Sequence, residues 1–232
     1  MHHLQAGEKP VLFFSVSGLR GTGRTTLYQK LKSTLPGAFP DIEFAFIGSP
    51  LGSLPLPLMW EQPEREKHAT TRLFECWSRL NPFSIAKLRP NLKPGRIVIS
   101  DGFGLDGLLY ATAGCDCPKE NAEAEDLHHQ LVRSRIKTQD LPAPQYLLVQ
   151  AAHQKVANWM LRSNPDLRES SSQLERERFI QHEERAIARY FQPENGQPRP
   201  FVLDATVYKM DALREQAERY IIDQFTQAAM AA

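Results

Sequence analysis

The sequence predicts an α/β fold of three layers, in which a five-stranded parallel sheet lies between two layers of helices. Two observations lead to this fold class. Five short apolar runs fit buried strands, and they alternate with segments whose apolar residues recur at helical spacing. Because no run shows the alternating polarity of a half-exposed hairpin, parallel pairing with helices on both faces is favoured.

Each expected strand is short and rich in Val, Ile, Leu, Phe or Tyr. The strands cover residues 11–17, 42–47, 96–100, 146–150 and 201–203. Helical spacing of apolar residues predicts seven helices between and after them. These cover residues 25–35, 67–80, 105–113, 122–135, 154–162, 174–191 and 210–225. Ligands of such sheets bind at the carboxyl ends of the strands, so we expect the functional residues there.

Length and composition predict a single domain over residues 1–232. The hydrophobic content of 41% and the charged content of 24% are ordinary for a globular protein. A net charge of +1 gives no general attraction to nucleic acid or to a membrane surface. No apolar run approaches the roughly 20 residues that a membrane span needs. Three cysteines without a disulfide spacing favour a reducing compartment. We therefore expect a cytoplasmic protein with no membrane partner.

A glycine-rich segment joins the first predicted strand to the first predicted helix. It reads Gly-Leu-Arg-Gly-Thr-Gly-Arg-Thr-Thr over residues 18–26. In this context the backbone N–H groups of the loop and the positive end of the helix dipole bind phosphate oxygens. The segment therefore predicts a P-loop and the P-loop NTPase fold. The residues expected to bind the nucleotide phosphates are Gly18, Arg20, Gly21, Thr22, Gly23, Arg24, Thr25 and Thr26.

Two residues of the loop carry the expected chemistry. Thr25 stands where the motif places the hydroxyl that binds Mg²⁺. Arg24 replaces the lysine that reaches the terminal phosphates. The exchange keeps the charge, but the guanidinium is larger and planar, so phosphate binding can persist while the geometry for transfer weakens. A glycine-rich turn without a ligand and a loop that binds phosphate without catalysis are the alternatives.

Five segments in order resemble the thymidylate kinase family over nearly the whole chain. They are residues 18–26, Ser-Asp-Gly-Phe at 100–103, Leu-Tyr-Ala-Thr-Ala-Gly at 109–114, the strand at 144–150, and Phe-Val-Leu-Asp-Ala-Thr at 201–206. The resemblance implies ATP and Mg²⁺ as cofactors, in-line transfer of the γ-phosphoryl group to a nucleotide-like acceptor, and a homodimer. Such transfer depends mainly on positioning and on charge stabilisation.

The resemblance also implies catalytic roles. Arg24 would hold the donor phosphates, and Asp101 would orient metal-bound water or the acceptor. Asp101 is therefore a second metal-binding candidate beside Thr25. A lid at about residues 162–179 would close over the transferred group. Its candidate arginines, of which we name Arg168 as the catalytic one, are Arg162, Arg168, Arg176 and Arg178.

Contacts to the acceptor are implied for Phe74, Arg79, Gly102 and Tyr110. Phe74 resembles a stacking aromatic of the family, and Arg79 lies near its base-contacting arginine. If this stretch is instead aligned with the family pattern backwards from Arg89, without insertions or deletions, Cys76 and Leu80 occupy those two positions. In that case Phe74 is a core residue, as an aromatic at helical spacing usually is.

Three positions depart from the family's acceptor site. Phe44 and Gly102 stand where arginines hold the acceptor's monophosphate, and Ala111 replaces a glutamine. Losing two cationic donors weakens recognition of a dianion, unless Arg72 or Arg79 replaces them. Three functions therefore stay open: a nucleotide kinase, a P-loop kinase for a neutral hydroxyl acceptor such as a nucleoside or a modified base, including one within DNA, and a non-catalytic nucleotide-binding protein.

A second group of candidate ligands is Cys115, Cys117, His128 and His129. The two cysteines are closer together than in the usual zinc motifs, and adjacent histidines on a helix face different directions. Loop thiols and a solvated helix face are therefore favoured over a metal site.

Overall fold

The computed structural model describes residues 10–19, 21–48, 67–112, 117–139, 141–163, 172–193 and 197–231. Five strands form one sheet in the order β2-β3-β1-β4-β5, and every pair of neighbours is parallel. The strands are β1 (Leu12–Gly18), β2 (Glu43–Ile47), β3 (Arg96–Asp101), β4 (Gln145–Gln150) and β5 (Phe201–Asp204). The predicted α/β fold with a five-stranded parallel sheet is confirmed, and each strand lies within a residue or two of its predicted bounds.

All seven predicted helices are present. They are α1 (Arg24–Ala38), α3 (Ala69–Phe83), α4 (Leu105–Thr112), α5 (Pro118–Gln139), α6 (His153–Ser163), α8 (Gln173–Tyr190) and α9 (Met210–Ala231). A π-helical turn over Ser84–Leu88 and a 3₁₀ turn over Arg89–Asn91 lead from α3 toward β3.

Helices α5 and α1 both extend beyond their predicted bounds at a proline. Helix α5 begins at Pro118, because proline suits the first helical position, where no N–H bond is lost. Helix α1 continues through Pro36 instead of ending before it, and the N–H of Phe39 closes the last turn on the carbonyl of Leu35 at 3.0 Å.

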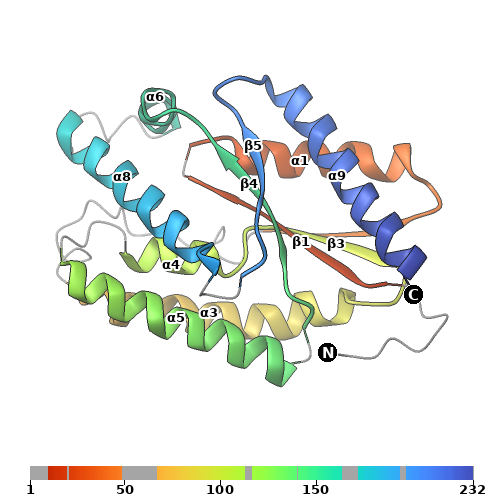
Figure 1. Ribbon diagram of the computed structural model, residues 1–232, viewed down its shortest axis with the longest axis horizontal. Coiled ribbons are helices and arrows are strands. Elements are labelled where there is room, and N and C mark those ends of the chain that lie inside the picture. The colour runs from red at the N-terminus through yellow and green to blue at the C-terminus, as the bar shows by residue number, and fades with distance from the viewer. Residues whose placement is uncertain are drawn as a thin grey trace.

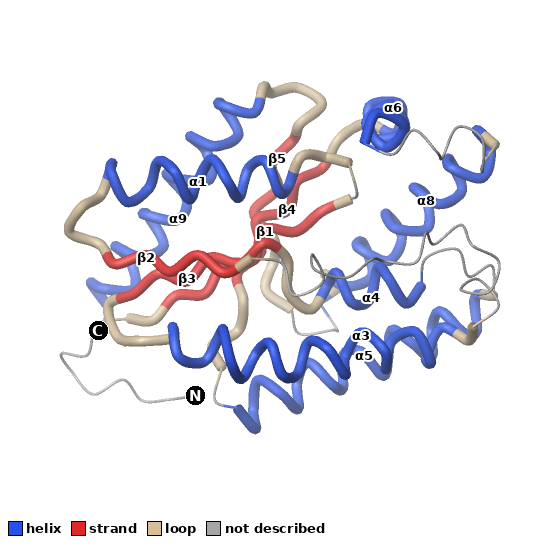
Figure 2. Tube along the Cα trace, turned by 180° about the vertical axis from the view of Figure 1, so that it is seen from behind, coloured by secondary structure: helices blue, strands red, loops and turns tan. Residues whose placement is uncertain are grey.

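The helices form two layers around the sheet (Figures 1 and 2). Helices α1 and α9 pack together on one face, whereas α3, α4 and α5 pack together on the other, with α8 beside α4. Strand β1 lies at the centre of the sheet, and its residues after Leu12 are buried. Phe14 and Val16 of β1 belong to the same buried cluster as Leu27 and Leu31 of α1. The first two elements are therefore anchored to each other by apolar contact.

The order of the strands creates a crevice at the carboxyl edge of the sheet. β1 and β3 are neighbours, with Val16 opposite Asp101, yet β1 leads into α1 on one face and β3 leads into α4 on the other (Figure 2). Connections that leave neighbouring strands toward opposite faces open a space between them, where ligands of such sheets bind. Gly18 and Asp101 are the last residues of β1 and β3, so both lie at this edge of the sheet.

A buried polar and aromatic cluster lies among α3, α5, α8 and β4. The indole N–H of Trp77 donates to Nδ1 of His128 at 3.3 Å, and the hydroxyls of Tyr146 and Tyr190 are hydrogen-bonded at 2.7 Å. His129 stacks on the ring of Tyr190. His128 is 0% exposed and His129 6%, so the prediction that they lie on a solvated helix face is wrong. Helices α3 and α4 pack against α5, and the ring of Tyr190 lies against both histidines.

The described residues contain no group of three or more His, Cys, Asp or Glu side chains placed to hold a metal. Cys115 lies outside the described residues. Within the described part of the chain, none of the helices combines the length and the apolarity that a membrane-spanning segment requires.

Burial makes the histidine cluster sensitive to acid. It lowers the pKa of His128 to about 3, and the neighbouring His129 adds to the shift. An unfolded chain restores a pKa of about 6.5. Between these values the unfolded state binds more protons, so we expect the free energy of unfolding to fall as the pH is lowered from about 6.5 toward 3. Urea unfolding between pH 7 and pH 4 measures this slope.

His128→Gln keeps an acceptor for Trp77 and removes the titrating group, so it should flatten part of the slope. A slope that is the same in His128→Gln as in the unmodified chain contradicts the assignment.

Candidate active site

The end of β1 passes unusually close to β4. A Cβ on Gly18 would lie only 2.2 Å from the carbonyl oxygen of Val149. Only glycine allows this approach of the two backbones, which directs the following loop over the carboxyl ends of the strands.

The loop after Gly18 folds into a tight turn and then into α1. The hydroxyl of Thr22 donates to the carbonyl of Leu19 at 2.8 Å, and Gly21 and Gly23 have φ angles of 77° and 90°. α1 starts at Arg24 with no capping side chain and no acidic residue in its first turn. The first N–H groups of the helix are therefore available to an anion, as the P-loop prediction requires. Arg20 lies outside the described residues.

Thr25 and Asp101 meet across the crevice. The Thr25 hydroxyl lies 3.4 Å from Oδ1 of Asp101 and donates a weak hydrogen bond to it. Thr25 and Thr26 are exposed in the first turn of α1, whereas Asp101 is buried at the end of β3. Burial raises the pKa of Asp101, and Arg24 and the Thr25 hydroxyl oppose the shift. The two predicted metal-binding residues are thus adjacent.

Arg24 is held by a carboxylate that the sequence analysis did not include. Its guanidinium donates from Nη1 to Oδ1 of Asp106, the second residue of α4. Burial lowers the pKa of Arg24, but the nearby carboxylates of Asp106, Asp101 and Glu183 outweigh it and raise the pKa overall. Arg24 is therefore a fixed cation surrounded by anionic groups.

Gly102 makes room for this ion pair. Its φ is 83°, and a Cβ there would lie 1.7 Å from Oδ2 of Asp106. Gly102 was predicted to bind the acceptor. In the structure its missing side chain leaves room for the carboxylate of Asp106. Within the described part of the chain, Oδ2 of Asp106 is buried and accepts no hydrogen bond.

A hollow of about 320 Å³ lies beside the loop, over the ends of β4 and β5. Leu19 of the loop, Ala151 after β4, and Ile187 and Ala188 of α8 provide its apolar wall. The turn after β5 is fixed to β4, since the N–H of Ala205 donates to the carbonyl of Gln150 at 2.7 Å. The hollow is large enough for a flat heterocycle. It adjoins the phosphate loop, because Leu19 of the loop forms part of its wall.

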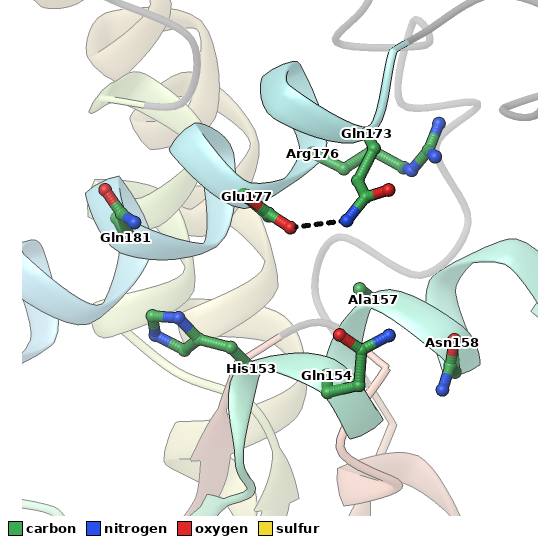
Figure 3. A pocket seen from close by; sticks show the side chains of 8 residues that line it. All are labelled: His153, Gln154, Ala157, Asn158, Gln173, Arg176, Glu177 and Gln181. Atoms are coloured by element: carbon green, nitrogen blue, oxygen red, sulfur yellow. Dashed lines mark hydrogen bonds between the residues drawn. The ribbon is translucent and has the colours of Figure 1, made fainter.

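A second hollow of about 250 Å³ separates α6 from α8 (Figure 3). Most of the residues that line it are polar, including His153 and Gln154 of α6 and Arg176 of α8. On the α8 wall, the side chain of Gln173 donates a hydrogen bond of 2.8 Å to Glu177. It lies at the two ends of the predicted lid. Arg168 and residues 164–171 are outside the described residues, and so is the side chain of Arg162.

The remaining residues predicted to contact the acceptor lie on α3 and α4 and differ in their exposure. Phe74 is 55% exposed on α3, so the alternative in which it is a core residue is wrong. Cys76 and Tyr110 are buried instead, on neighbouring helices. The backbone of Arg79 belongs to α3, but its side chain is not described. Arg72, named as a replacement for the lost arginines, is 2% exposed on α3.

Asp106 and Glu183 are the residues that sequence reasoning missed. The signal for Asp106 was available, because an acidic residue stands in an otherwise apolar helix (Leu-Asp-Gly-Leu-Leu-Tyr) directly after the Asp101 motif. Its partner was not visible, since Arg24 is 82 positions away in the chain. Nothing in the polar sequence around Glu183 sets it apart from its neighbours.

A comparison with known proteins found a relative that matches part of the chain. No protein-family model matches the chain. Over 106 residues it is 31% identical to a thymidylate kinase from Mycoplasma mobile. The chain is similar to a thymidylate kinase. The alignment covers 43% of this chain and 50% of the relative, so the chain spans about half the length of the curated protein it matches. This partial similarity agrees with a P-loop kinase relationship.

Gly102 and Asp106 should be coupled in stability. Gly102→Ala forces a side chain into a left-handed backbone, which costs about 1–2 kcal/mol, and also into the carboxylate of Asp106. We expect a larger loss in the unmodified chain than in an Asp106→Ala background, where the overlap is gone. Urea unfolding of the four proteins of this double-mutant cycle gives the coupling.

Gly104→Ala is the matched control, because its φ is 64° but its Cβ would meet only the hydroxyls of Tyr146 and Tyr190 and a methyl group, at 3.3 Å or more. Its cost should not depend on residue 106. Equal costs of Gly102→Ala in both backgrounds would contradict the contact.

Proposed function

We propose that the chain is a magnesium-dependent P-loop phosphotransferase that moves the γ-phosphoryl group of ATP to a nucleotide or nucleoside-like acceptor. One observation carries the proposal: the glycine loop that opens α1 faces Asp101 across the crevice, with 3.4 Å between the Thr25 hydroxyl and the Asp101 carboxylate. A glycine-rich turn on its own would not need a carboxylate opposite its first helical turn. The similarity to a thymidylate kinase supports the same reaction class.

The loop would bind the phosphates mainly through its backbone. N–H groups of the first turn of α1 meet the polyphosphate, and the helix dipole favours its charge. Arg24 donates one N–H to Asp106. A guanidinium has five N–H donors in a plane, so others remain to bind terminal phosphate oxygens. Asp106 would thereby hold Arg24 in one orientation.

The residues present fit Mg²⁺. This ion prefers oxygen ligands and is usually bound by one or two carboxylates together with substrate phosphates. The Thr25 hydroxyl and the Asp101 carboxylate are such ligands, and a buried carboxylate with a raised pKa gains from a nearby cation. Bound Mg²⁺ would neutralise charge on the phosphates. Thr25 and Asp101 would hold it, and Asp101 would also orient the attacking group.

A non-catalytic nucleotide-binding protein is the second candidate. The observation that favours it is the Arg24–Asp106 pair, because a guanidinium already engaged by a carboxylate is less available to the transferring phosphoryl group. The single domain over residues 1–232, the homodimer, the cytoplasmic location and the roles of Arg168, Arg79 and the lid stay predictions.

Magnesium should strengthen ATP binding through Thr25. We expect Thr25→Ala to weaken the binding of ATP with Mg²⁺ about tenfold and to leave binding without Mg²⁺ nearly unchanged, because only the hydroxyl is removed. Isothermal titration calorimetry with and without Mg²⁺ measures both. Thr25→Ser is the matched control and should bind as the unmodified chain does.

If ATP does not bind, both candidate functions fail. If ATP binds but labelled γ-phosphate is transferred to none of a panel of nucleosides, nucleotides and oligonucleotides, the second candidate holds.

The hollow over β4 and β5 should hold the base of the donor. Ala188 is exposed at its wall, so Ala188→Phe fills the hollow without disturbing the core. We expect the Kd for ATP to rise at least tenfold, while the Kd for inorganic tripolyphosphate, which has no base, stays the same. Equal losses for both ligands, or no loss for ATP, would place the base elsewhere.

A further inference from the structure

The oxygen atom Oδ2 of Asp106 is buried beside the candidate active site, and no described residue donates a hydrogen bond to it. Asp106 is 5% exposed, its other oxygen binds Arg24, and Oδ2 has no donor among the described residues. A buried carboxylate oxygen without a hydrogen bond is costly, so a ligand that supplies the donor would stabilise it. This atom belongs to the site, because it lies beside Arg24 and over Gly102.

The order of the strands places this atom at the reacting end of the nucleotide. In the proposed function the base lies over β4 and β5 and the phosphates follow the loop after β1. The next strand along the sheet in that direction is β3, which ends in Asp101. The terminal phosphate therefore points to the β3 side, where Asp106 also lies. Whatever accepts the phosphoryl group has to come close to Asp106.

The charges on that side disfavour an anionic acceptor. Asp106 and Asp101 are both near enough to Arg24 to raise its pKa, and both are buried. A monophosphate dianion brings only acceptor oxygens and would be repelled by a carboxylate in a poorly solvated site. An uncharged hydroxyl brings the donor that Oδ2 lacks.

We propose that Asp106 determines the class of acceptor: its Oδ2 accepts a hydrogen bond from an uncharged alcohol, and its charge excludes a monophosphate. This inference rests on the proposed function. In the reaction the hydroxyl oxygen forms a bond to the γ-phosphorus of ATP while the bond from that phosphorus to the β–γ bridging oxygen breaks. ADP leaves with the bonding pair, and the hydroxyl proton passes to Oδ2 of Asp106 and on to solvent.

The test compares matched acceptors that differ by one phosphate. Transfer from γ-labelled ATP is measured to the four 2′-deoxynucleosides, to their 5′-monophosphates, and to a DNA oligonucleotide with a 5′-hydroxyl. We expect kcat/KM to be at least tenfold higher for unphosphorylated acceptors than for their monophosphates. Transfer to monophosphates at equal or higher efficiency, or no transfer to any unphosphorylated acceptor, overturns the proposal.

Asp106→Asn separates the charge from the shape. The amide oxygen can still accept from Arg24, while the negative charge and the acceptor at the second position are lost. We expect the ratio of the two kcat/KM values to shift at least tenfold toward the monophosphate. The ratio is measured within one protein, so a loss of folded protein cancels. Asp211→Asn, at an exposed aspartate that pairs with Lys30 outside the crevice, should leave the ratio unchanged.

Calorimetry keeps the two proposals apart. If ATP does not bind, the proposed function fails, and this inference fails with it. If ATP binds and the preferred acceptor is a monophosphate, or if Asp106→Asn leaves the preference unchanged, the proposed function stands and the role of Asp106 is wrong.

Discussion

The site depends on the meeting of two strand-to-helix junctions at one edge of the sheet. β1 and β3 are hydrogen-bonded neighbours with Val16 opposite Asp101, so the junctions that follow them cannot lie far apart. Helices α1 and α4 leave toward opposite faces of the sheet (Figure 2). Their first turns begin next to each other at the strand ends, where such folds bind ligands. Thr25 meets Asp101 and Arg24 meets Asp106 for this reason.

Arg24, Gly102 and Asp106 form one interdependent arrangement. An arginine in the loop reaches further and is larger than the usual lysine, and Asp106 fixes it. The carboxylate can do so only because residue 102 has no side chain. A buried ion pair that loses one partner leaves an uncompensated charge, so none of the three can change alone without cost. The departures from the thymidylate kinase pattern at positions 24 and 102 are therefore physically linked.

The crevice is divided electrostatically between its two sides. The loop offers N–H groups and a helix dipole, which favour anions, whereas the β3 side carries Asp101 and Asp106, with Glu183 approaching from α8. In the proposed function, a polyphosphate with Mg²⁺ would bind on the first side and a hydrogen-bond donor on the second. A fold hosts different chemistries through such local changes, so the partial similarity to a thymidylate kinase leaves the acceptor to the residues of this chain.

The sequence by itself determined the sheet, the helices and the position of the phosphate loop, because these follow from local apolar patterns and glycine spacing. It also predicted Thr25 and Asp101 as a metal-binding pair, and the structure places the Thr25 hydroxyl 3.4 Å from the Asp101 carboxylate. It was wrong for His128 and His129, since the helices that cover α5 come from other parts of the chain. The pairing of Arg24 with Asp106 across 82 positions, and the use of Gly102 as space for it, were decided only by the tertiary structure. A contact between two charged side chains leaves no periodicity in the sequence, because it depends on which strands become neighbours.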